Sequence, residues 1–112
     1  MAEQSLAPIM VKLGNVTAVP MGQGRCFVVG NEEIAVFRQR DGRIFATPNR
    51  CPHRQGPLSE GLVGNGRVIC PLHGHQFDLA SGTGSEESEC IPVFEVEEVN
   101  GNLMMSVEAL QC

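Results

Sequence analysis

The stretches Cys51-Pro-His53-Arg-Gln-Gly-Pro-Leu58 and Cys70-Pro-Leu-His73-Gly-His-Gln-Phe77 decide how this chain is interpreted. Each begins with a cysteine that is followed, one or two residues later, by a histidine, and sixteen residues separate His53 from Cys70. Such short spacings let one loop present two ligands to one centre at little loop-closure cost. The pattern predicts a metal centre that two loops hold with two thiolates and two imidazoles.

The ligand types alone do not decide which metal is bound. A structural zinc site also accepts two cysteines and two histidines. The usual zinc-finger arrangement groups Cys with Cys and His with His, whereas each loop here supplies one of each. A zinc-bound structural module without redox activity is therefore kept as the distant alternative.

The two stretches resemble the paired motif of Rieske proteins, in which two thiolates hold one iron of a [2Fe–2S] cluster and two imidazoles hold the other. From Ala35 to Gly82 the chain is similar to Rieske-type ferredoxins and to the small subunit of NAD(P)H-dependent nitrite reductase. This resemblance implies a β-sandwich with a small two-loop subdomain that binds the cluster. By the family pattern, the inner iron is bound by Cys51 and Cys70 and the outer iron by His53 and His73.

Turn signals independently favour an all-β, antiparallel fold. Glycine-containing dipeptides that suit hairpin turns separate short apolar runs, at Gly30-Asn31, Asp41-Gly42, Asn65-Gly66 and Asn100-Gly101. The tight primed turns require positive φ, which these residues tolerate. The runs that they separate predict strands at 26–29, 34–37, 44–46, 67–69, 93–96 and 103–105.

The length predicts one domain over residues 1–112. Residues 51–64 and 70–84 are rich in Pro and Gly and are expected to be two ordered loops between strands. The two-residue period of a strand predicts that Phe94 and Val96 share one face of their strand, and that Leu103, Met105 and Val107 likewise share one face of theirs.

The net charge of −5 argues against nucleic acid as a partner, because phosphate binding relies on Lys and Arg. No apolar run approaches the roughly 20 residues of a spanning helix, and residues 1–8 lack the features of a secretory signal, so we expect no membrane association and a cytoplasmic location. Six of the eight basic residues lie from Arg38 to Arg67, which is typical of a solvated surface or, alternatively, indicates a mildly basic end that docks an acidic redox partner.

Departures from the high-potential Rieske proteins predict a low reduction potential. Those proteins carry an extra cysteine in each loop, where this chain has Gly56 and Leu72. They also place hydroxyl donors to the cluster sulfurs where this chain has His75 and Phe77. Because donors to sulfur stabilise the reduced cluster, we expect a potential of roughly −150 mV.

The resemblance implies one-electron transfer by a component that is not catalytic alone. One candidate is the small subunit of an assimilatory-type NAD(P)H nitrite reductase, with a sirohaem large subunit as partner. The alternative is a freestanding ferredoxin that links a flavin reductase to a ring-hydroxylating or other Rieske oxygenase. The remaining Cys and His residues are expected to be bystanders or to lie near the cluster without binding it: Cys26, His75, Cys90 and Cys112.

Overall fold

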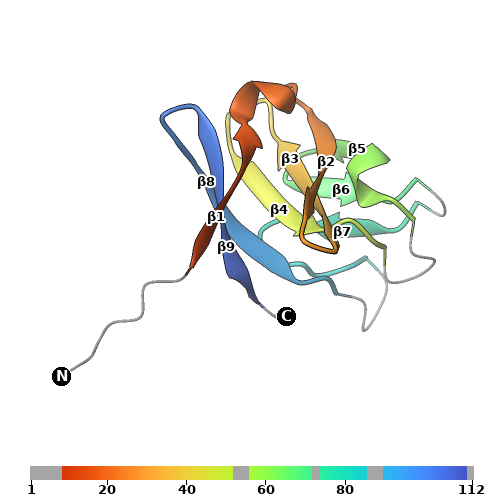
Figure 1. Ribbon diagram of the computed structural model, residues 1–112. Helices are drawn as coiled ribbons and strands as arrows, with labels where there is room; N and C mark the ends of the chain where they lie inside the picture. The colour runs from red at the N-terminus through yellow and green to blue at the C-terminus, as the bar shows by residue number, and fades with distance from the viewer. Residues whose placement is uncertain (1–8, 52–55, 72–73, 86–89, 111–112) are drawn as a thin grey trace.

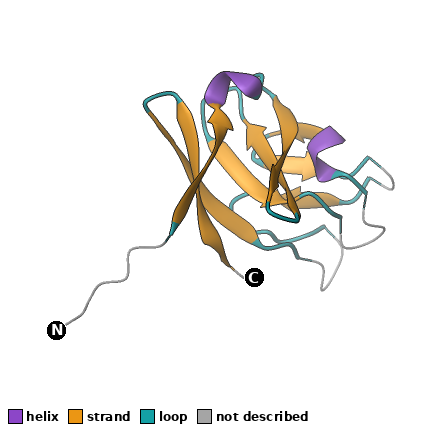
Figure 2. Cartoon of the chain, in the orientation of Figure 1, coloured by secondary structure: helices purple, strands orange, loops and turns teal. Residues whose placement is uncertain are grey.

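The computed structural model describes residues 9–51, 56–71, 74–85 and 90–110. Strands dominate these residues, with two short 3-10 helices beside them (Figure 2). The nine strands are β1 (Met10–Asn15), β2 (Gln23–Val29), β3 (Glu32–Arg38), β4 (Ile44–Pro48), β5 (Leu62–Gly64), β6 (Arg67–Ile69), β7 (Gln76–Asp78), β8 (Val93–Val99) and β9 (Asn102–Leu110). The helices are η1 (Val16–Ala18) and η2 (Leu58–Glu60).

The strands form two antiparallel sheets, which confirms the predicted fold class. The larger sheet has the order β1-β9-β8-β4-β3-β2 and the smaller has the order β5-β6-β7. Figure 1 shows the small sheet lying beside β2, β3 and β4, with β1 and the β8–β9 hairpin on the other side. No helix among the described residues is long and apolar enough to cross a membrane.

Hairpin turns occur at all four predicted dipeptides, but one has a different geometry. Asn65 and Asn100 adopt φ of 52° and 53°, and the glycine after each is also positive, as a primed two-residue turn requires. At Asp41-Gly42 only the glycine has positive φ, at 96°. The N–H of Gln39 instead donates to the carbonyl of Arg43 at 2.8 Å around a three-residue loop, so the prediction of a tight primed turn is wrong there.

Parts of the two predicted loops are strands. The first contains η2 and β5, and the second contains β7. Both short strands pair with β6, in the registers Leu62↔Ile69 and Ile69↔Gln76. Three residues are too few to show a strand period in the sequence, so their pairing becomes visible only when the chain is folded.

Strand β3 lies between two apolar cores, which explains why its middle is buried without interruption. Ala35 and Phe37 pack against the small sheet, while Ile34 and Val36 pack inside the curled large sheet. Alternate residues of a strand face opposite sides, so a strand with a core on each side has no solvent-facing position. The first core contains the residues that carry the candidate site.

The alternation predicted for the last strand holds at Leu103 and Met105 but fails at Val107. Ser106 is buried and Val107 is 42% exposed. The pairing of β8 with β9 passes from Phe94↔Ala109 to Val96↔Met105, so β9 contains extra residues at this point. At this irregularity the neighbours Met105 and Ser106 are both buried, so the strict alternation is broken before Val107 and the prediction is wrong there.

Candidate metal centre

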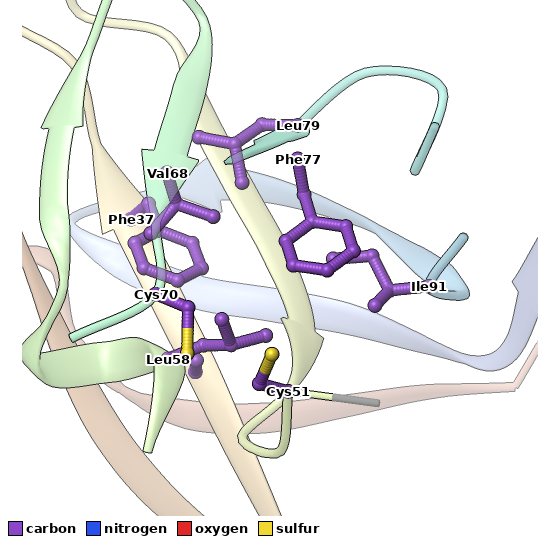
Figure 3. Packing of buried hydrophobic residues seen from close by; sticks show 9 residues of the cluster. Phe37, Cys51, Leu58, Val68, Cys70, Phe77, Leu79 and Ile91 are labelled. Atoms are coloured by element: carbon purple, nitrogen blue, oxygen red, sulfur yellow. The ribbon is translucent and has the colours of Figure 1, made fainter. Parts of the chain in front are cut away.

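Cys51 and Cys70 are brought together in the core between the two sheets. Cys51 follows β4 and Cys70 follows β6, and their exposed fractions are 1% and 2%. Both thiols are free of disulfides. In Figure 3 they lie at the same end of the cluster, below the rings of Phe37 and Phe77. The fold therefore places two thiols, one from each predicted loop, in one apolar environment.

The backbone closes the two ligand loops in the same way. The N–H of Cys51 donates to the carbonyl of Gly56 at 2.9 Å, and the N–H of Cys70 donates to the carbonyl of His75 at 2.7 Å. In both loops the acceptor lies five residues after the cysteine. The N–H of Gly74 also donates to the carbonyl of Cys70 at 3.1 Å. Each cysteine thus stands at the base of a short closed loop.

The predicted histidine ligands fall within these closed spans. His53 and His73 lie outside the described residues, so their assignment as ligands stays a prediction. His75 has its carbonyl in the closure of the second loop, which gives this residue a structural role that the sequence did not reveal.

Asn49 anchors the first loop, and sequence reasoning missed it. Its side chain is 5% exposed, and its Oδ1 accepts a hydrogen bond from the buried N–H of Ser59 at 2.7 Å. Its Nδ2 donates to Oε1 of Glu33 at 3.3 Å, and its backbone N–H donates to the carbonyl of Glu33 at 3.0 Å. Asn49 therefore ties the segment before Cys51 both to η2 and to β3.

A tight turn after β7 anchors the second loop. Oδ1 of Asp78 accepts from the N–H groups of Ala80 and Ser81, both at 2.9 Å, and these bonds lower the pKa of its carboxyl group. Gly82 then adopts φ of 82°, and its carbonyl accepts a hydrogen bond from the N–H of Ile91 at 2.8 Å. A Cβ at Gly82 would overlap the carbonyl oxygen of Ile91. Only glycine fits this close approach, which holds Ile91 in the core with the cysteines.

The surroundings of the thiols are apolar. Phe77, which occupies a position where high-potential relatives are expected to carry a hydroxyl, is fully buried in the same cluster. Its ring provides no O–H donor toward a cluster sulfur. The rest of the cluster is aliphatic or aromatic as well: Ala35, Phe37, Leu58, Val68, Leu79 and Ile91.

The donor set fits a [2Fe–2S] cluster. Two buried thiols on separate loops can hold one iron away from water, and each loop also carries a histidine within its closed span for the second iron. The other described cysteines do not contribute. Cys26 is largely exposed, and the partial burial of its thiol together with nearby Glu33 raises its pKa. Cys90 is disulfide-bonded.

The basic residues from Arg38 to Arg67 lie at both ends of the β3–β4 hairpin, and Arg54 lies outside the described residues, so a basic docking end stays a prediction. Arg50 directly precedes Cys51, whereas Arg40 and Arg43 flank the turn at the opposite end of the β3–β4 hairpin. Nη1 of Arg38 points instead at the carbonyl of Val19, at 3.1 Å. Arg43 and Arg50 are close in the sequence, but the length of β4 separates them in the fold.

A family model described as Rieske [2Fe-2S] domain matches residues 9–95. Ferredoxin CarAc of Metapseudomonas resinovorans is 34% identical over 82 residues, which cover 71% of this chain and 76% of that protein. The anthranilate 1,2-dioxygenase ferredoxin subunit of Burkholderia cepacia is 37% identical over 82 residues, 71% of this chain and 75% of that protein.

Other curated relatives are much longer. The 4beta-methylsterol monooxygenase of Methylococcus capsulatus is 49% identical over 47 residues, which cover 42% of this chain and 13% of that protein. The chain spans between 13% and 24% of the length of the first four curated relatives that it matches, all of them oxygenases.

Solved structures of two kinds share the fold. The ferredoxin–oxygenase complex of carbazole 1,9a-dioxygenase contains a chain that is 28% identical, with a TM-score of 0.78 and coverage of 95% of this chain and 100% of that one. A putative small subunit of NADPH nitrite reductase is 25% identical, with a TM-score of 0.79 and coverage of 87% and 97%.

Proposed function

Since the chain belongs to the Rieske [2Fe–2S] domain family and is an electron-transfer protein with a [2Fe–2S] cluster as cofactor, we propose that it serves as a ferredoxin component that supplies electrons to a Rieske oxygenase. The observation that carries this proposal is the pair of ferredoxins that share 34% and 37% identity and match over about three quarters of their own lengths. The electron donor in this proposal is a flavin reductase, and the location is the cytoplasm.

Within this proposal, Cys51 and Cys70 would hold one iron of the cluster, and His53 and His73 would hold the other. The burial of both thiols and the matching closure of both loops support the assignment. Bound in this way, the cluster supplies a one-electron redox couple.

The chain's own residues set the conditions for transfer. The apolar cluster around Cys51 and Cys70 excludes water from the thiolates, and a lower local polarity disfavours the more negatively charged reduced state. Phe77 adds no hydrogen bond that would offset this effect. We therefore propose a potential near the low end of the Rieske range, roughly −150 mV. Neutral imidazoles at 53 and 73 would leave their second N–H groups for the partner protein.

The second candidate is the small subunit of a nitrite reductase. It is favoured by the solved putative subunit at 25% identity and by the stretch Gly56-Pro-Leu-Ser-Glu-Gly-Leu-Val63. In that case the chain would pass or organise electrons for a sirohaem partner. The two candidates share the cluster and differ in the partner.

Reconstitution separates the two candidates. The purified chain, loaded with its cluster, is mixed with a flavin reductase and a Rieske oxygenase, and NADH-dependent oxygenase turnover is measured with and without the chain. A ferredoxin restores turnover and binds both partners transiently. Stable co-purification with a large sirohaem protein, together with no restored oxygenase turnover, would replace this proposal with the second candidate.

The cluster itself is tested by spectroscopy. A rhombic EPR signal after dithionite reduction, lost on substitution of His53 or His73, would support the ligand assignment. A signal that survives both substitutions would refute it.

A further inference from the structure

A hollow of about 320 Å³ lies where the turns at one end of the two sheets meet, and we call it the seam hollow. The turn between β3 and β4 forms one wall and the turn between β5 and β6 forms the other. Its lining includes Gly22, Gln39, Arg40, Asp41, Arg43 and Asn65.

Gln39 has a buried amide that lacks a hydrogen-bond partner. It continues the alternation of Ala35 and Phe37, so its side chain is placed on the face of β3 that packs against the small sheet. Gln39 is 6% exposed, and its Nε2 has no partner among the described residues. A buried donor without an acceptor is costly. The donor lies in a residue that lines a hollow, where an acceptor could be supplied from outside.

Two arginines, Arg40 and Arg43, line the same hollow as Gln39. Arg40 lies over Gly22, where a Cβ would come within 3.1 Å of its Nε. Among the described residues, Arg43 and Asp41 form an ion pair, and Arg40 forms none. The absence of a Cβ at Gly22 therefore lets an uncompensated cation lie against the rim of the seam hollow.

Arg43 reaches across the seam from the larger sheet. Its Nε donates to Oδ2 of Asp41 at 2.8 Å, and its guanidinium lies 5.6 Å from the centre of the Phe45 ring. Its Nη2 approaches Gly66 in the opposite turn, 3.9 Å from where a Cβ would be. Asp41 balances one of the two arginines, so the lining keeps an excess of one positive charge.

We propose that the seam hollow binds a carboxylate group. A carboxylate has two oxygens that accept hydrogen bonds, and it matches the flat donor array of a guanidinium. In the proposed complex Arg40 pairs with the carboxylate, and the Gln39 amide rotates about its terminal bond to donate to it. The ligand thereby compensates both the exposed cation and the buried donor.

The seam hollow is far from the thiols. Cys51 lies eight positions after Arg43 in the segment that contains β4, and Cys70 lies five positions after Asn65 in the segment that contains β6. At about 3.3 Å per strand residue, these spans correspond to roughly 15 to 25 Å. A ligand here therefore binds at the end of the molecule opposite to the cluster loops, and the site stands independently of the choice between the two proposed partners.

The carboxylate can come from a free small organic acid or from a Glu or Asp side chain of a partner protein. Both sources present the same group to Arg40 and Gln39. A side chain differs from a free acid in size and in the neutral backbone that surrounds its carboxylate. Comparing the affinity for acetate with that for a capped glutamate peptide therefore distinguishes the two sources.

The test is an NMR titration of the cluster-loaded, oxidised protein, labelled with ¹⁵N. Sodium acetate, the capped glutamate peptide and inorganic phosphate are added in turn at constant ionic strength, with sodium chloride as the salt control. We expect acetate or the peptide to shift the Gln39 side-chain NH₂ signals saturably, with a dissociation constant of about 1 mM, the affinity that a few charge-assisted hydrogen bonds support.

Three variants make the test specific. Arg40→Gln should weaken carboxylate binding by about tenfold or more, as the loss of one charge-assisted bond predicts. Gln39→Leu should also weaken binding, followed through the backbone signals of the β3–β4 turn, while the unliganded protein unfolds at the same temperature or higher because the unpaired amide is gone. The control Arg25→Gln removes a charge that lies outside the lining and should bind as the parent does.

Each outcome bears on the proposal. Tighter binding of the peptide than of acetate assigns a partner side chain, and equal or weaker binding assigns a free acid. Tighter binding of phosphate than of either would overturn the choice of carboxylate. Shifts that chloride reproduces, or that persist in Arg40→Gln, would overturn the site itself.

Discussion

Replacing Asn49 with alanine should loosen the first cluster loop. The change removes the acceptor of the buried Ser59 N–H and the donor to the Glu33 carboxylate. An unsatisfied buried N–H costs about 1–3 kcal/mol, and the bond to the exposed Glu33 adds about 0.5 kcal/mol. The free energy of unfolding should therefore fall by about 2 to 3 kcal/mol, which lowers the Tm of a domain of this size by about 8–12 °C.

The assay combines anaerobic thermal unfolding with the rate at which a chelator bleaches the cluster absorbance. Asn49 lies two residues before Cys51, so we expect the variant to bleach faster as well as to melt earlier. Asn15→Ala is the matched control, because Asn15 also accepts a backbone N–H, from Thr17 at 2.9 Å, but at an exposed site. Asn15→Ala should lower the free energy of unfolding by about 1 kcal/mol and leave the bleaching rate unchanged. A loss of less than about 0.5 kcal/mol in Asn49→Ala would refute the role of this residue as an anchor.

Three further predictions concern the ligands and the second loop. Cys70→Ser should abolish the reduced EPR signal, because a thiolate of the cluster is lost. Gly82→Ala should lower the free energy of unfolding by more than about 2 kcal/mol, measured in urea, because φ of 82° is strained for alanine and the new Cβ would overlap the carbonyl oxygen of Ile91. Asp78→Asn should reduce the loss of folding stability in acid. Because the pKa of Asp78 is lowered in the folded protein, its carboxylate contributes its full stabilisation above the unfolded-state pKa of about 3.9, and this stabilisation is lost as the pH falls through the folded-state pKa.

The controls for these predictions follow from the same structure. Cys26→Ser should keep the EPR signal, since Cys26 is exposed and lies outside the core of the cluster cysteines. Gly30→Ala tests strain alone, because Gly30 has φ of 62° and nothing lies within 4 Å of the new Cβ; it should cost only about 1 kcal/mol. Equal losses in Gly82→Ala and Gly30→Ala would contradict the close approach to Ile91. An unchanged pH profile in Asp78→Asn would contradict the stabilising role of its charge.

Local patterns were enough to predict much of this protein. The spacing of Cys51, His53, Cys70 and His73 predicts a metal centre without any knowledge of the fold, because the candidate ligands of each pair are neighbours in the chain. The Asn65-Gly66 and Asn100-Gly101 turns were likewise readable, since the preference for positive φ belongs to the residues themselves. The same reasoning failed at Asp41, where the closure of Gln39 on Arg43 sets the turn.

Other features depended on parts of the chain that are distant in sequence. The continuous burial of residues 34–37 in the middle of β3 follows from their place between two cores, and Val107 turns outward where the pairing of β9 with β8 is irregular. Nothing local marks Asn49 as the acceptor for Ser59, or Gln39 as a buried donor at the seam.

The sequence by itself thus determined the candidate ligands, the hairpin turns and the all-β class, because each rests on the chemistry and conformational preferences of residues close together in the chain. Only the tertiary structure decided that Cys51 and Cys70 share one apolar core, that Asn49 and Gly82 hold their loops, and that Gln39 and Arg40 line one hollow with Asn65 at the opposite end. Those features depend on burial and on the packing of one sheet against the other, and both arise only when distant segments meet.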